Sequence, residues 1–594
     1  MKTKLLSIFF LALMLASLCI GKVSAQGPKI LPSGINYAEI GQHIEAFVAE
    51  HQATTAGLAL AVFDSEGTIY KNFFGHADLE ANFPVTQDTV FEWGSVSKLL
   101  VWVSVMQLEE QGLIDLEADI KTYLPDGFLT NLKYPEPISM LNLMNHTPGF
   151  QEKIVNLFIE PGVEVNNLAE NLQDVPPAQV YRPGDLHAYS NWGVALAGYI
   201  VERISGKPFF QYVHDAIFEP LGMKNTGLAP DLSDNPAVSQ ARKQLRCYTS
   251  DRQLIADCLF QIPLYPAGMV TGTLEDFLSF GRALVKTPSP LFKSPETAER
   301  LFQPTAYFGD SGVGLNSHGF WAHFYKVRTL GHGGNTAGGS SMLQIDPLSG
   351  TGMVVMTNQA TEKTYNAKML ELVFGKFSDS DLAGYNTAIP AGVFRPARAV
   401  VTGPLSLASN SLAVMDASDL ETFWVLEQKD GRERVVYAYT DLVRLSTGEL
   451  ILVGVLWGGL VLGILFALIN LLGDGLIGSI VRRLRAKMAG QPLPADPQRR
   501  WRLLSSALQI LVLINLAVLF IQVMTYQRLQ SFLWQSVLFG VMGIGIIVLM
   551  VYYLRKIRHI GTAKQKWMSA ASFIFLCLTA LNILHWQLYR FWAF

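Results

Sequence analysis

Four long apolar runs close the C-terminal part of this 594-residue chain. Each run is about 20 residues long, the length that an α-helix needs to cross a hydrocarbon core of ~30 Å. The runs are 450–472, 503–524, 532–554 and 568–588. Only short polar breaks separate them, which argues against buried helices of a water-soluble domain. The sequence therefore predicts a four-helix transmembrane domain over residues 450–594, with the lipid bilayer as its partner.

Charge is distributed unevenly between the two parts of the chain. Residues 450–594 hold 14 basic and 2 acidic residues, whereas the rest holds 32 basic and 47 acidic ones. The basic residues concentrate in the connections 473–502 and 555–567, and the connection 525–531 has only Arg528. Because positively charged loops stay in the cytoplasm, residues 26–449 are predicted to lie outside the cell membrane. Their acidic balance and the lack of a basic, aromatic stripe exclude nucleic acid as an expected partner.

The N-terminus has the pattern of a secretory signal peptide. Lys2 and Lys4 precede an apolar run over 5–20, and small residues end at Ala25. We predict that residues 1–25 are removed by cleavage after Ala25, which agrees independently with an external location for the residues that follow. The bulky residue Leu18 before Cys19 disfavours attachment of a lipid.

Two cysteines remain for the exported part of the chain. Cys247 and Cys258 have a spacing that suits a staple across a hairpin, and two free thiols fit the sequence equally well. The other two, Cys19 and Cys577, lie in apolar segments.

Helices and strands alternate irregularly over residues 26–391. The patterns predict a hairpin from 56–63 and 67–74, a buried strand over 352–357, and helices over 95–110 and 192–204. The expected fold class is α+β, with helices against an antiparallel sheet.

Residues 392–449 have a different character, with short β-prone stretches between turn residues. We interpret them as a small strand-rich stalk before the transmembrane domain. The stalk either packs on the preceding domain or holds it above the bilayer.

The sharpest chemical motif is Ser95-Val96-Ser97-Lys98, at the start of an apolar helix that ends at Gly112. A three-residue spacing places Ser95 and Lys98 on one helical face, where the amine can take the proton of the hydroxyl. The helix N-terminus stabilises negative charge at Ser95, and burial disfavours the charged form of Lys98. Alone the motif is weak, because a capping serine with a surface lysine gives the same pattern.

A second motif is Tyr189-Ser190-Asn191, which opens the helix predicted over 192–204. A tyrosine and an asparagine two residues apart on a turn can both point into one site. A helix cap with a packed tyrosine is the alternative interpretation.

The third motif is His332-Gly333-Gly334-Asn335, which small residues and a strand follow. Glycines such as Gly334 let a substrate backbone approach the strand edge, and a backbone amide just after them can donate to an oxyanion. A plain glycine turn would look similar.

In this order, the three motifs resemble those of the serine β-lactamase and penicillin-binding protein superfamily. The chain is most similar to class C β-lactamases and to the D-alanyl-D-alanine carboxypeptidase and D-aminopeptidase group, over roughly residues 35–375. Further similar segments are 145–149, 220–223 and 266–270. The resemblance implies a β-lactamase-like antiparallel sheet flanked by helices, plus an all-helical domain, and no cofactor.

The resemblance also implies a role for each catalytic residue. Ser95 would attack a carbonyl and form an acyl-enzyme, with Lys98 as the proton acceptor. Tyr189 would relay a proton to the leaving group and help to activate the water that removes the acyl group.

Substrate binding would fall to the remaining motif residues. Asn191 would hydrogen-bond the substrate amide, and His332 would lie near the substrate carboxylate or the neighbouring chain, beside Gly334. The backbone amides of Ser95 and Asn335 would form the oxyanion hole. Since neither H-x-H-x-D nor H-E-x-x-H occurs, no catalytic metal is expected.

Several functions fit these motifs, because a fold and a catalytic set do not fix the substrate. Our first choice is a peptidase for small peptides that contain D-amino acids, and the alternatives are a β-lactamase or an esterase. A non-enzymatic membrane sensor acylated by a β-lactam would need a larger cytoplasmic part, and a transporter would need ionisable residues within its spans. Four glycines of the first span predict a homodimer through the transmembrane helices: Gly454, Gly458, Gly459 and Gly463.

Overall fold

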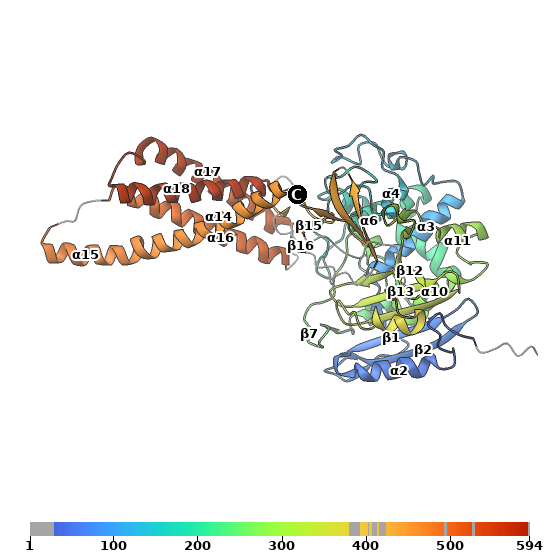
Figure 1. Ribbon diagram of the computed structural model, residues 1–594. Helices are drawn as coiled ribbons and strands as arrows, with labels where there is room; N and C mark the ends of the chain where they lie inside the picture. Colours follow the sequence, from blue (N-terminus) through green and yellow to red (C-terminus); the bar gives the residue numbers. More distant parts are fainter. Residues whose placement is uncertain are drawn as a thin grey trace, which may run out of the picture.

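The computed structural model describes residues 29–378, 392–401, 403–406, 413–414, 423–429, 431–491, 496–524 and 529–591. The predicted signal peptide, its cleavage site and Cys19 lie outside these residues. Figure 1 shows three parts: an N-terminal domain (residues 29–378), a small C-terminal sheet (393–444) and a helical bundle (447–591) that projects from one side.

The N-terminal domain is built on one nine-stranded antiparallel sheet. From edge to edge, its strands are β3 (Phe83–Pro84), β2 (Thr68–Asp78), β1 (Gly57–Phe63), β14 (Thr351–Thr357), β13 (Ser340–Asp346), β12 (Arg328–Asn335), β11 (Phe320–Phe324), β10 (Gly314–Ser317) and β9 (Ala306–Tyr307). The predicted hairpin corresponds to β1 and β2, and the predicted buried strand corresponds to β14.

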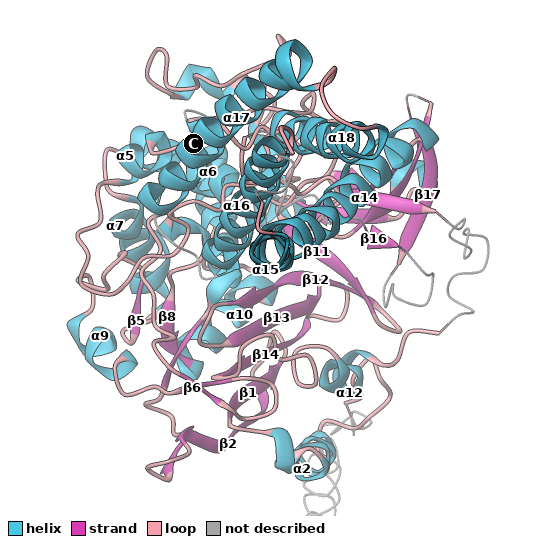
Figure 2. Cartoon of the chain, turned by 90° about the vertical axis from the view of Figure 1, so that its left-hand side faces the viewer, coloured by secondary structure: helices cyan, strands magenta, loops and turns pink. Residues whose placement is uncertain are grey.

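Side chains of β1 alternate between the two faces of the sheet, as successive residues of a strand must. Leu58 and Leu60 pack in one core with α2 (Ile40–Glu50) and α12 (Glu371–Phe374). Ala59 and Ala61 belong to the larger core on the other face, which includes α10 (Leu274–Val285). Figure 2 shows α2 and α12 on the same side of the sheet. Every residue of β1 is therefore buried because helices cover both faces of the sheet. The expected α+β class is confirmed.

A helical layer completes the larger core. Its main helices are α3 (Lys98–Glu110), α4 (Met140–Met144), α5 (Leu168–Gln173), α6 (Asn191–Ser205), α7 (Phe209–Val213), α8 (Glu219–Leu221), α9 (Pro236–Arg242) and α11 (Pro295–Leu301). Every residue of α3 from Lys98 to Leu108 is buried, so this helix lacks a polar face and runs through the centre of the domain. The helix predicted from Ser95 begins with a 3-10 turn, η2 (Gly94–Ser97), and continues as α3.

A disulfide bond joins Cys247 and Cys258, which decides between the two alternatives left open by the sequence. It closes the short hairpin of β6 (Cys247–Tyr248) and β7 (Leu254–Ile255). A Cβ atom added to Gly338 would lie 2.7 Å from Cys247 Sγ, so the hairpin supports the turn between β12 and β13.

The C-terminal sheet has five antiparallel strands and packs on the N-terminal domain. Their order is β16 (Ala413–Val414), β15 (Val393–Pro396), β19 (Leu442–Arg444), β18 (Arg432–Tyr437) and β17 (Trp424–Lys429). The Tyr189 amide donates to the Tyr439 carbonyl at 2.9 Å, and the Asp441 amide donates to the His187 carbonyl at 2.9 Å. Asp441 Oδ2 in turn accepts from the His187 amide at 3.0 Å.

The bundle contains four helices that are long and apolar enough to cross a membrane: Thr447–Ala489, Arg499–Val523, Ser531–Ile557 and Ala563–His585. In Figure 1 the first of them comprises α14 (Thr447–Ile469), a π-helical turn η10 (Asn470–Ile477) and α15 (Gly478–Ala489). The others are α16 (Arg499–Met524), α17 (Leu529–Tyr552) and α18 (Ala563–His585). The helix thus continues through residues 476–489, which belong to the basic connection 473–502 of the sequence.

Polar side chains lie among large apolar ones in the interior of the bundle, and many further large apolar side chains are exposed on its outside. Arg502 is 1% exposed and donates to Asp474 and Asp496 at 2.6 Å each. Asn582 Nδ2, on α18, donates to the Leu456 carbonyl of α14 at 3.0 Å. Such bonds join helices where lipid offers no hydrophobic driving force between them.

The C-terminal end of α18 meets a segment that follows β15. The Gly403 amide donates to Gln587 Oε1 at 3.1 Å, and Ser406 Oγ donates to the Trp586 carbonyl at 3.1 Å. Two residues before Gly403, the Val401 amide donates to Gln151 Oε1 of the N-terminal domain at 3.0 Å. Residues 397–401 and 403–406 thus connect the bundle to the N-terminal domain.

Candidate active site

Ser95 lies in the η2 turn, and Lys98 begins α3 one turn later. Lys98 Nζ lies 2.9 Å from Ser95 Oγ and donates to the Ala267 carbonyl at 2.5 Å. Lys98 is fully buried, whereas Ser95 is partly exposed. The hydroxyl is therefore open to a substrate, and the amine behind it is shielded from water.

Burial holds the pKa of Lys98 well below its usual value of 10.5, and the nearby positive charge of Arg398 lowers this pKa further. Glu152 opposes the shift by favouring the charged form. A neutral amine keeps a lone pair, so it can accept the proton of the Ser95 hydroxyl.

Ser97, the other serine of the motif, has a structural position. Its hydroxyl donates to the Gly94 carbonyl at 2.6 Å and accepts from the Val270 amide at 3.2 Å. The Trp93 amide also donates to the Val270 carbonyl, at 2.8 Å. These bonds fix the η2 turn against the strand that precedes α10.

Tyr189 lies beside the same lysine, immediately before α6. Its ring centroid is 4.9 Å from Lys98 Nζ, and the ring stacks on His146 at 4.6 Å. Burial raises the pKa of the Tyr189 phenol, while a hydrogen bond with Ser95 and the charge of Arg398 oppose this rise. His146 Nδ1 accepts from the Ser190 amide at 3.0 Å, which fixes the turn between Tyr189 and α6.

Asn191 is the first residue of α6 and is partly exposed next to Tyr189. The helix begins here because the Ser190 side chain accepts from the Gly193 amide at 3.0 Å.

The end of β12 lies against the η2 turn. A Cβ atom on Gly334 would lie 2.0 Å from the Trp93 carbonyl, so only glycine permits this approach. A Cβ atom on Gly94 would lie 2.9 Å from the Asn335 amide nitrogen, which places that amide next to Ser95. Asn335 itself is exposed. The two amides named for an oxyanion hole therefore lie on adjacent segments.

His332 is buried at 2% exposure, with its ring centroid 5.9 Å from that of Tyr189. Its Nδ1 lies 2.6 Å from the Gly333 carbonyl. Burial lowers the pKa of His332 to about 3, so the ring is neutral at neutral pH. The structure brings all seven predicted residues together, but His332 adds no positive charge to the site.

Sequence reasoning missed three residues that surround Tyr189. The ring of Tyr439 lies 5.9 Å from that of Tyr189, and the guanidinium of Arg398 lies 4.8 Å from it. Arg398 Nε donates to Glu152 Oε2 at 2.5 Å. Arg398 and Tyr439 come from the C-terminal sheet, and no local motif marks them in the sequence.

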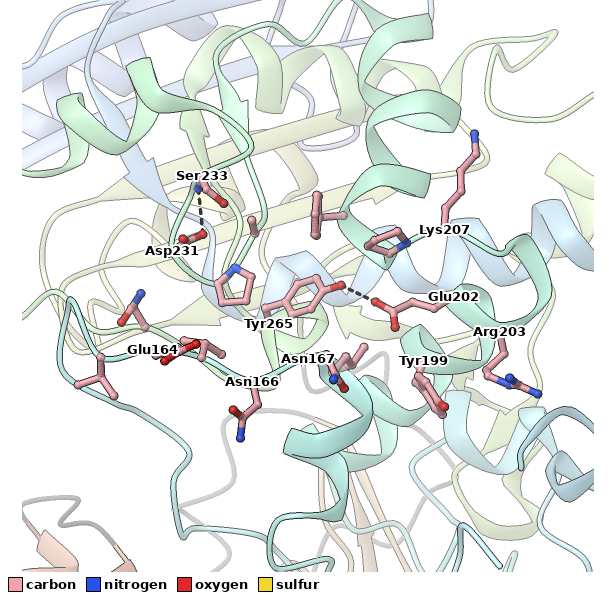
Figure 3. Close-up of a pocket in the computed structure, with 18 of the residues that line it drawn as sticks. Glu164, Asn166, Asn167, Tyr199, Glu202, Arg203, Lys207, Asp231, Ser233 and Tyr265 are labelled. Atoms are coloured by element: carbon pink, nitrogen blue, oxygen red, sulfur yellow. Dashed lines mark hydrogen bonds between the residues drawn. The ribbon is translucent and has the colours of Figure 1, made fainter. Parts of the chain in front are cut away.

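A pocket of about 790 Å³ lies at the other end of α6 (Figure 3). Tyr265 and Glu202 face one another there, with the Tyr265 hydroxyl donating to Glu202 Oε1 at 2.8 Å. Tyr265 begins the short 3-10 turn that contains Ala267. The bond to Glu202 therefore supports the Ala267 carbonyl, which accepts a hydrogen bond from Lys98 Nζ. The pocket itself lies roughly 16 Å along α6 from Asn191.

Within the part of the chain that the structure describes, no group of three or more His, Cys, Asp or Glu side chains could hold a metal ion. The site offers a hydroxyl, a buried amine with a lowered pKa, a phenol and backbone amides. These groups suit covalent acyl transfer.

The Beta-lactamase family matches residues 40–375, more than half of the chain. This protein therefore belongs to the Beta-lactamase family, whose members are serine hydrolases and include penicillin-binding proteins. The family and the fold predicted from the three motifs are confirmed.

Individual relatives share a modest identity with this chain. Penicillin-binding protein 4 of Amycolatopsis lactamdurans is 24% identical over 363 residues, covering 58% of this chain and 91% of that protein. Esterase EstB of Burkholderia gladioli is 31% identical over 186 residues, or 28% of this chain and 46% of the esterase. The crystal structure of D-amino acid amidase from Ochrobactrum anthropi SV3 is 22% identical, with a TM-score of 0.47, over 57% of this chain and 97% of the amidase.

Proposed function

We propose that this protein is a membrane-anchored, extracytoplasmic serine hydrolase that cleaves peptides containing D-amino acids through an acyl-enzyme. The observation that carries the proposal is the buried Lys98 amine, 2.9 Å from the partly exposed hydroxyl of Ser95. The family membership and the penicillin-binding relative support a peptide as the substrate.

In the proposed reaction, Ser95 Oγ forms a bond to the substrate carbonyl carbon while its proton passes to Lys98 Nζ. The amides of Ser95 and Asn335 donate to the oxyanion. When the C–N bond breaks, the leaving amine takes a proton relayed by Tyr189. Water, activated at the same group, then hydrolyses the ester and restores Ser95.

Substrate selectivity tests the proposal. We expect purified full-length protein to cleave D-Ala-D-Ala or N-acyl-D-Asn peptides with a kcat/KM at least about tenfold above that for the matched L-peptides, which is about 1.4 kcal/mol of transition-state discrimination. The same panel includes nitrocefin and short-chain p-nitrophenyl esters. Equal rates on D- and L-peptides, or turnover restricted to nitrocefin or esters, would overturn the peptidase assignment.

An esterase is the second candidate. It is supported by the name of the Burkholderia relative, which is 31% identical over the aligned 186 residues. A neutral His332 also suits an uncharged ester. Ester turnover with no peptide turnover would favour this candidate.

We further propose that the N-terminal domain lies outside the cell and that the connection around α15 is cytoplasmic. Leu348 is 98% exposed and Met488 is 88% exposed, so each can report which side it occupies. In intact cells, an impermeant maleimide is expected to label Leu348→Cys and to spare Met488→Cys until the membrane is opened. The reverse pattern would exclude this topology.

We also propose a homodimer through α14, with a contact surface that includes only two of the four glycines named from the sequence. A Cβ atom on Gly459 or Gly463 would lie 2.7 or 3.4 Å from side chains of α18 in the same chain. Gly454 and Gly458 have no such neighbour within 4 Å. Purified protein that sediments only as a monomer in detergent would remove the proposal.

A further inference from the structure

A second pocket lies where the C-terminal sheet meets the first membrane helix. Its volume is about 270 Å³, and strands β15, β18 and β19 line it together with Glu449 in the first turn of α14. Figure 1 shows β15 at the junction between the bundle and the rest of the molecule. Because α14 continues from here as a long apolar helix, the pocket lies at the surface of the bilayer when the bundle is in a membrane.

The lining of this pocket is strongly basic. Six of its side chains are basic, and two, Asp185 and Glu449, are acidic. The basic side chains are Arg182, Arg395, Lys429, Arg432, Arg434 and Arg444. Arg182, Arg434 and Arg444 each form a short salt bridge with a glutamate that lies outside the lining. The other three cations are held less tightly.

Arg395 is the least satisfied of these cations. Within the described ranges of the chain, its buried Nε has no hydrogen-bond partner and its guanidinium forms no salt bridge. Burial raises the pKa of the Tyr181 phenol, another group of the lining, to about 12, and the charge of Arg395 opposes this rise. An arginine stays protonated in proteins, and a buried donor left unpaired costs free energy that a bound anion would recover.

Lys429 and Arg432 have only weak partners. Lys429 Nζ lies 3.5 Å from Asp185 Oδ1 and donates to the Asp185 carbonyl at 3.3 Å. Arg432 Nη1 lies 3.6 Å from Glu449 Oε1, and the Arg432 side chain is 57% exposed. Glu449 Oε2 is engaged elsewhere, because it accepts from the Ser446 amide at 2.9 Å. Such exposed pairs contribute little to stability, so both cations can turn towards another anion.

The place of the pocket favours a lipid phosphate over a phosphate free in solution. A phosphate offers several anionic oxygens to a guanidinium fork. In the turns of α14 that follow Glu449, the apolar side chains of Ile451, Leu452 and Val455 are exposed. Acyl chains can therefore lie along α14 while the headgroup reaches Arg395. Basic pockets at the end of membrane helices attract anionic headgroups in this way.

We propose that this basic pocket binds the phosphate of an anionic phospholipid headgroup, with Arg395 as its central donor. The bound lipid links β15 to the start of α14 and so fixes the N-terminal domain relative to the bilayer. This inference uses the membrane anchor of the proposed function, and it does not depend on the substrate of Ser95.

Native mass spectrometry of the full-length protein in detergent measures the binding. Phosphatidylglycerol should bind at least about tenfold more tightly than a diacylglycerol with the same acyl chains. Arg395→Met should lower the affinity for phosphatidylglycerol by about tenfold or more, and Arg395→Lys should recover part of the loss, since it keeps the charge without the fork. Equal binding of the two lipids to wild-type protein, or an affinity that Arg395→Met leaves unchanged, would overturn the inference.

Arg590→Met is the matched control. Arg590 follows α18, whose C-terminal end lies beside the start of α14, with the rings of Trp457 and Trp586 6.4 Å apart. Arg590 therefore lies at the same surface of the bilayer, but it does not line the pocket. Its loss should leave the binding of phosphatidylglycerol within about threefold of wild type. An equal loss in both variants would show that the lipid responds to surface charge in general and would remove the pocket.

Inorganic phosphate separates the two sources of the anion. A large excess of it should not displace phosphatidylglycerol, because the acyl chains add contacts that free phosphate lacks. If inorganic phosphate instead displaces the lipid from wild-type protein and raises the unfolding temperature of wild type but not of Arg395→Met, the pocket takes free phosphate and the lipid assignment fails.

Labelling of Ser95 by a fluorophosphonate, which needs no lipid, shows that each variant is folded. If Arg395→Met is not labelled, Arg432→Met replaces it with the same expected loss of lipid affinity, and unchanged affinity there would again overturn the inference. A protein that cleaves no D-peptide would end the proposed substrate while the lipid measurement still stands. The two failures are therefore distinguishable.

Discussion

Ser95→Ala is expected to abolish covalent labelling by a fluorophosphonate or a fluorescent penicillin and to lower kcat/KM by about ten-thousand-fold or more. The reason is that Ser95 Oγ is the partly exposed hydroxyl within reach of the Lys98 amine, at 2.9 Å. Alanine leaves the amine in place but removes the atom that forms the acyl bond. Intact-protein mass spectrometry after incubation with the label measures the effect directly.

The neighbouring Ser97 provides the control for this substitution. Ser97→Ala removes a hydroxyl of the same kind, which bonds to the Gly94 carbonyl and to the Val270 amide. Because the buried Val270 amide loses its acceptor, the variant should lose about 1–3 kcal/mol of stability while Ser95 is still labelled. Labelling that persists in Ser95→Ala and disappears in Ser97→Ala would reassign the nucleophile.

Lys98→Met is expected to reduce acylation of Ser95 by about a thousand-fold or more, because Lys98 Nζ takes the serine proton in the proposed reaction. In wild-type protein, kcat/KM should fall as the pH drops through the lowered pKa of Lys98, since a protonated amine cannot act as the base. Stopped-flow acylation rates across a pH series measure both effects. A wild-type rate that is independent of pH down to the acid unfolding transition would contradict the role of Lys98.

The same substitution should change stability in a pH-dependent way. Burial lowers the pKa of Lys98 in the folded state below the unfolded value of 10.5, so between these two values the unfolded chain binds more protons. Stability therefore rises with pH across this window, and the penalty for burying Lys98 is largest below the lowered pKa. The gain in folding stability of Lys98→Met over wild type should be largest at low pH and smallest near pH 10.5. A loss of stability that does not depend on pH, from the unpaired Ala267 carbonyl, offsets this gain.

Lys153→Met is the control for both measurements. Lys153 is another buried lysine, whose Nζ donates to the Asn171 carbonyl at 3.1 Å, and burial lowers its pKa to about 8. Its substitution should change stability with pH between about 8 and 10.5 and should leave acylation within about threefold of wild type. An equal loss of acylation in the two variants would show that Lys98 acts through folding alone.

The C-terminal sheet contributes residues to the surroundings of the candidate active site. Interpreted from sequence as a stalk, this segment contributes Arg398 and Tyr439 to the surroundings of Tyr189. Gly403 and Ser406, which follow Arg398, also bond to the C-terminal end of α18. One short segment after β15 therefore contacts both the bundle and Tyr189. A domain that ended at residue 391 would lack Arg398 beside Tyr189.

Local chemistry was readable from the sequence by itself. The three-residue spacing of Ser95 and Lys98, the cap at Ser190 and the length of the apolar runs all depend on residues close together in the chain. Helical periodicity and the thickness of a bilayer convert such patterns directly into structure. Gly334 is different. The sequence predicts that this glycine lets a substrate backbone approach the strand edge, whereas in the structure its missing Cβ permits the contact with the Trp93 carbonyl.

Only the tertiary structure decided which distant groups meet. Tyr189 and Arg398 are brought together where the C-terminal sheet packs on the N-terminal domain, and Cys247 and Cys258 by the closing of a hairpin. Gly459 and Gly463, which the sequence offered to a second copy of the chain, pack on α18 of their own chain. Spacing along the chain carries no information on such contacts, because they depend on how preformed elements bury one another's surfaces.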